Sequence, residues 1–264
     1  MPAKRKRHSI APASTNRPLP PAKNRPPPSA SPTVPNLLLA ALPLDDYKQL
    51  APTLEIVSPK LKDILHKPGE PLQHVYFPGG GGFLSVVTVL EDGRMVEVAT
   101  IGREGMVGAA AVSDQGPAPA MAIVQAVMDT CCRMTAKAFR REMDRHGAFY
   151  HVMTQYAQAL VGVVMQSTAC NAVHSVEQRL ARWLLLAHDR VGRDEFPLTQ
   201  EFVAMMLGAA RPTVTVVAGT LQRAGLITYR HGHVTIVSRD GLEHASCECY
   251  RAATKLLRSV TRRL

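Results

Sequence analysis

The sequence predicts an α+β fold with three parts that follow one another along the chain. Between 53 and 135, short runs of alternating apolar and polar residues are separated by glycine and proline, which predicts strands joined by turns. From 147 to 170 the apolar period becomes helical and predicts one long helix. From 198 to 237, two helical patterns meet at a sharp corner and are followed by a hairpin pattern.

In the last of these parts, individual residues mark where each helix begins and ends. Thr199 can cap a first helix and Gly208 ends it, whereas Pro212 suits the first turn of the next helix because it lacks an N–H. Gly225 ends that helix, and two short strands flank His231–Gly232. The residues expected to be buried are Phe202, Val203, Met206, Leu207, Val214, Val217, Ala218 and Leu221. This order is typical of a winged helix-turn-helix, whose second helix lies in the major groove of DNA.

A resemblance strengthens this interpretation over two packed helices that serve only in dimerisation. Four runs occur in the order and spacing of the DNA-binding domain of the Crp/Fnr family of bacterial transcription regulators: S-V-E-Q-R-L-A-R-W-L-L (175–185), L-T-Q-E (198–201), R-P-T-V (211–214) and G-L-I (225–227). The chain resembles this family over about 37–250, most strongly in its last third. The resemblance implies an N-terminal β-roll of the cyclic-nucleotide-binding jelly-roll type, a long dimerisation helix and a C-terminal winged helix-turn-helix.

Four segments are expected. Residues 1–36 hold ten prolines, seven Lys or Arg and no acidic residue, which predicts a disordered basic tail because few apolar groups offset its ordering entropy. Residues 37–146 are expected to form the β-roll sensor domain and 147–172 the dimerisation helix. Residues 173–264 are expected to form the winged-helix domain, which ends in a basic amphipathic helix over 240–263.

The composition narrows the class of protein. The net charge of +10 is uneven, with +7 in residues 1–36, −2 in 37–174 and +5 in 175–264, so the basic ends favour phosphate as a partner. No signal peptide or membrane-length apolar run is evident, and five cysteines form no disulfide framework. A cytoplasmic protein without a membrane partner is expected.

Local patterns also predict elements of the sensor. A short helix is expected over Leu37–Leu50, with Leu38, Leu42 and Leu50 packed against the sensor. The segment 83–101 predicts a hairpin with a two-residue turn at Asp92–Gly93, across which Glu91 would face Arg94. Another strand is expected from 123 to 127, and a helix over about 136–145.

The long helix carries a heptad seam of Phe149, Met153, Tyr156, Leu160, Val163, Ser167 and Cys170. A buried core helix would give the same spacing, and a seam that ends in Ser and Cys is weak. The position between sensor and winged helix favours dimerisation, as the resemblance implies. The expected interface is Phe149, Met153, Tyr156, Leu160 and Val163.

Double-stranded DNA is the expected partner of the second helix. By resemblance, Arg211 matches the family's base-contacting arginine, which binds guanine. Pro212 and Val216 depart from the glutamate and second arginine of the family pattern, which puts the family's usual operator in doubt. The expected contacts are to bases from Arg211, Thr213, Thr215 and Val216, and to phosphates from Thr199, Gln200, His231 and His233. The resemblance also implies a second copy of the chain and RNA polymerase as partners.

The sensor lacks the residues with which family members bind cyclic nucleotides. In those members the glutamate of a Gly-Glu pair accepts a hydrogen bond from the ribose hydroxyl, and an arginine followed by Ser or Thr binds the cyclic phosphate. Here Gly108 is followed by Ala109, and Ala120-Met121 stand at the second position. Cyclic AMP binding in the usual way is therefore not expected, although Arg103 and Glu104 lie nearby in the chain. The effector is another small molecule or none.

No motif for catalysis is present, since HExxH, GxSxG and a phosphate-binding loop with Gly-Lys-Ser/Thr are all missing. The family's iron–sulfur branch is excluded because residues 1–130 hold no cysteine. Cys247-x-Cys249 with His244 could supply three metal ligands, but no partner motif accompanies them, so no metal or cofactor is expected. The alternative function is a protein-interaction module whose degenerate winged helix does not read DNA.

Overall fold

The computed structural model describes residues 35–113 and 116–261, and most of the expected basic tail lies outside them. The helices are α1 (Leu37–Ala40), α2 (Leu44–Leu50), α3 (Ala136–Met143), α4 (Ala148–Val173), α5 (Val176–Val191), α6 (Gln200–Leu207), α7 (Arg211–Arg223), α8 (Arg239–Ala245) and α9 (Cys249–Thr261). The strands are β1 (Glu55–Val57), β2 (Ile64–His66), β3 (His74–Pro78), β4 (Phe83–Val89), β5 (Met95–Ile101), β6 (Met121–Ala126), β7 (Cys131–Thr135), β8 (Glu195–Pro197), β9 (Ile227–Arg230) and β10 (His233–Ile236). Short 3₁₀ helices are η1 (Ala51–Thr53) and η2 (Ala109–Ser113).

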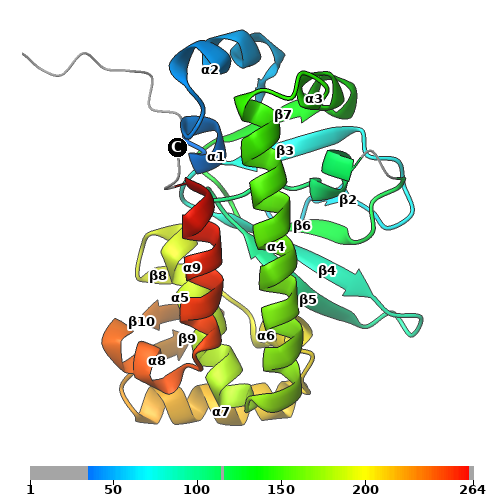
Figure 1. Ribbon diagram of the computed structural model, residues 1–264. Coiled ribbons are helices and arrows are strands. Elements are labelled where there is room, and N and C mark those ends of the chain that lie inside the picture. The colour runs from blue at the N-terminus through cyan, green and yellow to red at the C-terminus, as the bar shows by residue number, and fades with distance from the viewer. Residues whose placement is uncertain (1–34, 114–115, 262–264) are drawn as a thin grey trace, which may run out of the picture. The chain divides into compact units, whose positions relative to one another are not determined.

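Two antiparallel sheets form the N-terminal half, in the orders β1-β7-β3 and β2-β6-β4-β5. The long helix α4 runs past these sheets toward the helices of the C-terminal half (Figure 1). A β-rich part, a long helix and a helix-turn-helix part follow one another as predicted, so the expected fold class is confirmed.

The β4–β5 hairpin forms where it was predicted, but its turn differs. The Leu90 N–H donates to the carbonyl of Arg94, which leaves a three-residue loop with Gly93 at φ +80°. Arg94 pairs with Asp92 at 2.7 Å and not with Glu91. A loop that ends in a left-handed glycine is the usual three-residue hairpin, so the expected two-residue turn is wrong.

The helix expected over 37–50 is two helices, because Pro43 begins α2 and has no N–H with which to continue α1. Leu38, Leu42 and Leu50 are buried as expected. Asn36, at the end of the predicted tail, is 1% exposed and caps α1, and its amide donates to Pro78 and Gly105 carbonyls at 2.9 and 2.8 Å. Asn36 therefore belongs to the folded sensor and not to the tail.

The seam predicted on α4 faces the chain's own core. Phe149, Met153, Tyr156 and Val163 are each at most 7% exposed and belong to a core with α1, α3 and α9. Leu160 is half-buried. The open side of α4 instead carries Val161 and Met165, 55% and 68% exposed. The predicted helix is confirmed, but most of the seam residues are buried within one chain.

The C-terminal half has one strand more and one helix more than predicted. β8 adds to the β9–β10 hairpin in the order β8-β10-β9. The helix expected over 240–263 breaks into α8 and α9, and α9 packs along α4 (Figure 1). Its apolar face, which includes Tyr250, Ala253 and Leu257, is buried.

Among the described residues no single helix is long and apolar enough to span a membrane. Only α6 and α7 together reach that length and composition, as a pair bent by 106°.

Candidate functional site

The α6 and α7 helices form the predicted helix-turn-helix, crossing at 106°. Thr199 caps α6 by accepting the Phe202 N–H at 3.2 Å, and Gly208 ends it in the left-handed conformation at φ +58°. Val203, Met206 and Leu207 of α6 and Val214, Ala218 and Leu221 of α7 are buried together with α5. Burial of these faces fixes which side of α7 points outward.

The outward side of α7 carries the residues expected to meet bases. Arg211, Thr213 and Thr215 are exposed, and Val216 is 65% exposed. Within the part of the chain that the structure describes, the Arg211 guanidinium has no hydrogen bond or ion pair. Because it stands at the first position of α7, it is free to reach past the helix end toward a ligand.

Two contacts place the residues expected to meet phosphates beside this helix. The Thr215 hydroxyl, expected to meet a base, donates to Oε1 of Gln200, expected to meet a phosphate, at 2.8 Å. The Thr199 methyl lies next to Gly232 at the tip of the β9–β10 hairpin. The start of α6, the hairpin tip and the outward side of α7 therefore belong to one surface.

The hairpin itself is the predicted wing. His231 and Gly232 have φ of +49° and +76°, as a two-residue type I′ turn requires, and both His231 and His233 are exposed. The Tyr229 hydroxyl donates to the Leu198 carbonyl, and the Leu198 N–H donates to the Gly232 carbonyl at 2.7 Å. Burial raises the pKa of Tyr229 to about 12, so the phenol keeps the proton for this bond.

A cavity of about 560 Å³ lies between the sensor sheets and α4. Gly108, Ala109 and Ala120, which stand where the family's cyclic-nucleotide ligands belong, all line it. Most other lining side chains are aliphatic, including Val86, Ile101, Met106, Leu160 and Val164. No Lys, Arg, Asp or Glu is among the described residues that line it.

His66 is the only titratable side chain among the described residues that line this cavity, and no local sequence pattern predicts it. Its Nε2 lies 2.8 Å from the His74 carbonyl and donates to it. Burial lowers the pKa of His66, so the imidazole is neutral near pH 7. It therefore supplies hydrogen bonds without a fixed positive charge.

Arg103 and Glu104 do not reach this cavity. Glu104 pairs with Arg190 of α5 at 2.7 Å, and both Arg103 and Glu104 line a different hollow beside α9. The possibility that they replace the missing cyclic-nucleotide ligands is therefore wrong. They lie where the sensor contacts the C-terminal half.

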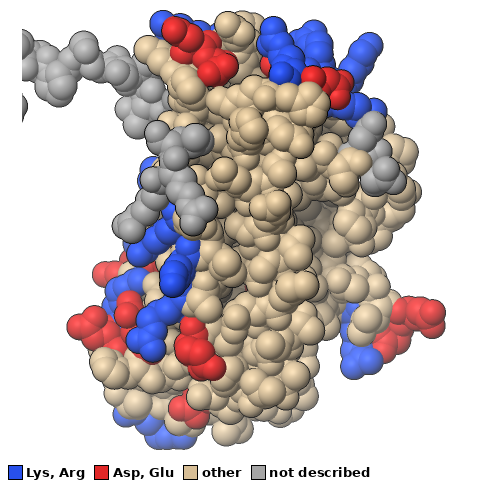
Figure 2. All heavy atoms as spheres, in the orientation of Figure 1, with Lys and Arg blue, Asp and Glu red and all other residues tan. Residues whose placement is uncertain are grey.

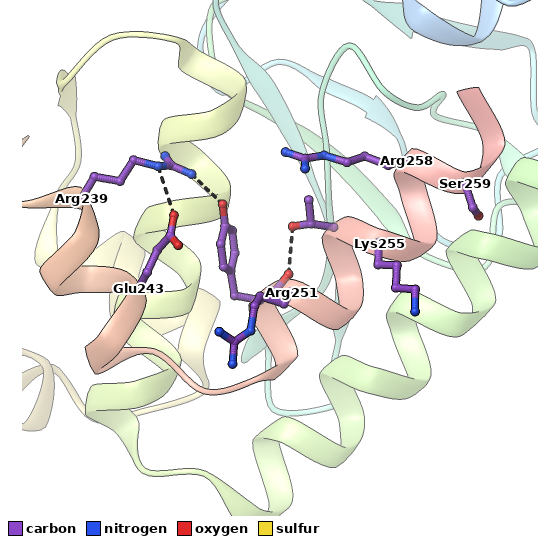
Figure 3. A pocket seen from close by; sticks show the side chains of 8 residues that line it. Arg239, Glu243, Arg251, Lys255, Arg258 and Ser259 are labelled. Atoms are coloured by element: carbon purple, nitrogen blue, oxygen red, sulfur yellow. Dashed lines mark hydrogen bonds and ion pairs between the residues drawn. The ribbon is translucent and has the colours of Figure 1, made fainter. Parts of the chain in front are cut away.

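A basic groove of about 490 Å³ lies along α8 and α9. Arg251, Lys255 and Arg258 are exposed there, and in Figure 3 Lys255 points away from Arg239 while Arg258 points toward its side of the groove. Arg239 itself is held by Asp189 at 2.7 Å and by Glu243 at 3.3 Å. In Figure 2 basic side chains, with acidic ones among them, lie over α8 and α9, whereas the middle of the face over α4 carries no charged side chain.

Comparisons with known proteins agree with this geometry. A family model described as a Crp-like helix-turn-helix domain matches residues 178–245, and one described as a cyclic nucleotide-binding domain matches residues 57–146. Together they cover more than half of the chain. No protein of curated function matches the chain in sequence.

Solved structures share the fold. A Crp/Fnr-family transcriptional regulator from Eubacterium rectale is 20% identical with a TM-score of 0.62, and the match covers 79% of this chain and 96% of the other. A CRP-family regulator from Thermus thermophilus is 21% identical with a TM-score of 0.60, over 72% and 96%. FixK2 from Bradyrhizobium japonicum is 14% identical with a TM-score of 0.57, over 74% and 98%. With a cyclic-nucleotide-binding-like sensor before a Crp-like helix-turn-helix, the chain belongs to the Crp/Fnr family of transcription regulators.

Proposed function

We propose that the protein regulates transcription as a homodimer that reads a specific DNA site through α7. The observation that carries this proposal is Arg211, an exposed guanidinium at the first position of α7 that has no ion pair among the described residues. A planar guanidinium in that position can donate two hydrogen bonds to one guanine, which is the commonest specific contact to DNA. RNA polymerase is a further partner that the family relationship supports.

The surrounding residues have separate roles in this proposal. Thr213 and Val216 contact thymine methyl groups, whereas Thr215 positions Gln200 through the bond described above. Thr199, Gln200, His231 and His233 contact phosphates on either side of the reading helix.

Two copies associate through α4 in this proposal. The 26 residues of α4 include no Asp, Glu, Lys or Arg, and its open side exposes Val161 and Met165. A charge-free helix face of this kind favours contact with another copy over contact with water. The proposed dimer interface therefore lies on the exposed face of α4, beside the buried seam that the sequence predicts. Leu160 lies at its edge.

The effector, if the protein has one, is small and uncharged. The cavity is aliphatic and His66 is neutral, so a cyclic phosphate would lose the charge-assisted bonds that bind it elsewhere in the family. A ligand with an apolar body and one acceptor or donor for His66 fits this lining better.

Selection of bound fragments from a random DNA library tests the reading helix. The wild type should enrich a near-palindromic site with half-sites about 34 Å apart. Arg211→Ala should bind that site about 5- to 150-fold more weakly and lose preference at one base pair of each half-site, a cost of about 1–3 kcal/mol. Arg223→Ala is the matched control, because Arg223 lies in the last turn of the same helix.

An enriched site that Arg211→Ala binds as tightly as wild type would overturn the assignment of α7. No enrichment at any salt concentration would favour the alternative, a winged helix that binds protein.

A further inference from the structure

Three cysteines and a histidine from distant parts of the chain meet at the end of α4. Cys170 lies in the last turn of α4, and His174 follows the helix. Cys247 lies between α8 and α9, and Cys249 is the first residue of α9. The cysteines are at most 4% exposed and form a small cluster apart from the apolar cores.

The four ligand atoms have the spacing of one tetrahedral site. One ligand atom from each residue, the Sγ of each cysteine and a ring nitrogen of His174, lies within 4.8 Å of the other three. Cys170 Sγ is 3.5 Å from Cys247 Sγ, and Cys249 Sγ is 3.6 Å from His174 Nδ1. A Zn–S bond of about 2.3 Å gives a tetrahedron with edges of about 3.8 Å, close to these distances. A polynuclear cluster would need its ligands spread around several metal atoms.

We propose that Cys170, His174, Cys247 and Cys249 bind one Zn²⁺ ion that ties the end of α4 to the start of α9 and the residues just before it. Three thiolates and one imidazole form a set that favours zinc. Because four protein groups fill a tetrahedron, no position remains for water or substrate. The site is therefore structural.

Neighbouring side chains complete the site. His174 Nε2 lies 3.3 Å from Glu248 Oε2, so the carboxylate accepts from the ring and directs Nδ1 toward the metal. Such a carboxylate behind a histidine ligand is a common feature of zinc sites. Gln166 Nε2 donates to Cys249 Sγ at 3.0 Å.

A buried cation lies near the site and can balance its negative charge. Three thiolates around Zn²⁺ leave one negative charge, which is costly in a buried place without compensation. Arg182 is 7% exposed, and its guanidinium donates to the hydroxyl of Ser167 at 3.5 Å, about one turn of α4 before Cys170. Its Nε is buried without a hydrogen-bond partner among the described residues. The guanidinium thus has capacity left for an anionic site.

His244, which the sequence placed with Cys247 and Cys249, is not in this set. It is exposed on α8, where its ring nitrogen bonds the Asp240 carbonyl at 2.7 Å. Cys170 and His174 take part instead, from a segment about 75 residues earlier in the chain.

Metal analysis of the full-length protein, purified under reducing conditions without chelator, is the direct test. We expect one zinc per chain. Cys249→Ala should lose it, whereas His174→Cys should keep it because a fourth thiolate can replace the imidazole. His244→Ala is the matched control and should keep it.

Replacing zinc with Co²⁺ in the wild type gives a readout that needs no variant. Tetrahedral thiolate ligation should produce intense visible absorption that disappears when zinc is added back. Folded wild-type protein with less than about a tenth of an equivalent of zinc, even after incubation with zinc salt, would overturn the proposal. So would iron in place of zinc, or a mass that shows a Cys170–Cys247 disulfide.

Discussion

Trp183 of α5 donates a 2.9 Å hydrogen bond from its indole to Glu97 of β5, so the sensor hairpin and the C-terminal half share one carboxylate. Ser85 and Thr100 donate to the same carboxylate. Phe83 packs edge-on against the indole at 5.9 Å between ring centroids. Together with the Glu104–Arg190 pair, this contact joins the sensor strands to α5, which packs against α7.

The burial of Glu97 predicts that the free energy of unfolding depends on pH. Burial raises the pKa of Glu97, although the three hydrogen bonds and Arg182 lower it in part. A raised pKa means that the folded state holds the proton more tightly than the unfolded state. The stabilisation from Glu97 is therefore present below its pKa in the unfolded state and is lost as the pH rises through its pKa in the folded state.

Glu97→Gln tests this prediction, since the amide oxygen can still accept from Trp183 but no longer ionises. We expect the variant to unfold at higher urea than wild type at pH 7.5, with a smaller difference at pH 5. Trp183 is the only tryptophan, so its fluorescence reports unfolding at this contact. A difference that does not change with pH would contradict the prediction.

Replacing Asn36, near the end of the expected tail, should strongly lower the free energy of unfolding. Asn36→Ala removes the α1 cap and leaves the Pro78 and Gly105 carbonyls without their donor. The expected loss is about 2–4 kcal/mol in the free energy of unfolding. Asn36→Asp is the informative control, because it keeps the cap but cannot donate to the carbonyls, and it should also destabilise the protein.

Much of the fold could be predicted because its signals are local. The wing turn at His231–Gly232 and the α6–α7 corner at Gly208 each depend on residues a few positions apart. The side that α4 buries could not be predicted, since a heptad seam looks the same whether Met153 and Tyr156 meet their own chain or a partner. The cysteine cluster could not be predicted either, because Cys170 and Cys247 meet only through packing of α9 on α4.

The proposed dimer predicts which side of α4 matters. Met165→Glu places a charge on the apolar face twice in a two-fold dimer, so sedimentation should show monomers. Ile56→Glu is the matched control, because Ile56 is 74% exposed on β1 and Met165 is 68% exposed. A Met165→Glu protein that remains dimeric would move the interface off this face.

The cavity predicts the class of effector. Calorimetric titration with cyclic AMP and cyclic GMP should show no binding, since the described lining has no cation for the phosphate.

An uncharged apolar probe such as N-phenyl-1-naphthylamine should bind and gain fluorescence, because a preformed aliphatic cavity favours apolar ligands. Ala120→Phe fills part of the cavity and should weaken that binding by about tenfold or more. Ala40→Phe, on the exposed end of α1, should leave it unchanged. Micromolar affinity for either cyclic nucleotide would contradict the prediction, and equal probe binding by wild type and Ala120→Phe would place the probe elsewhere.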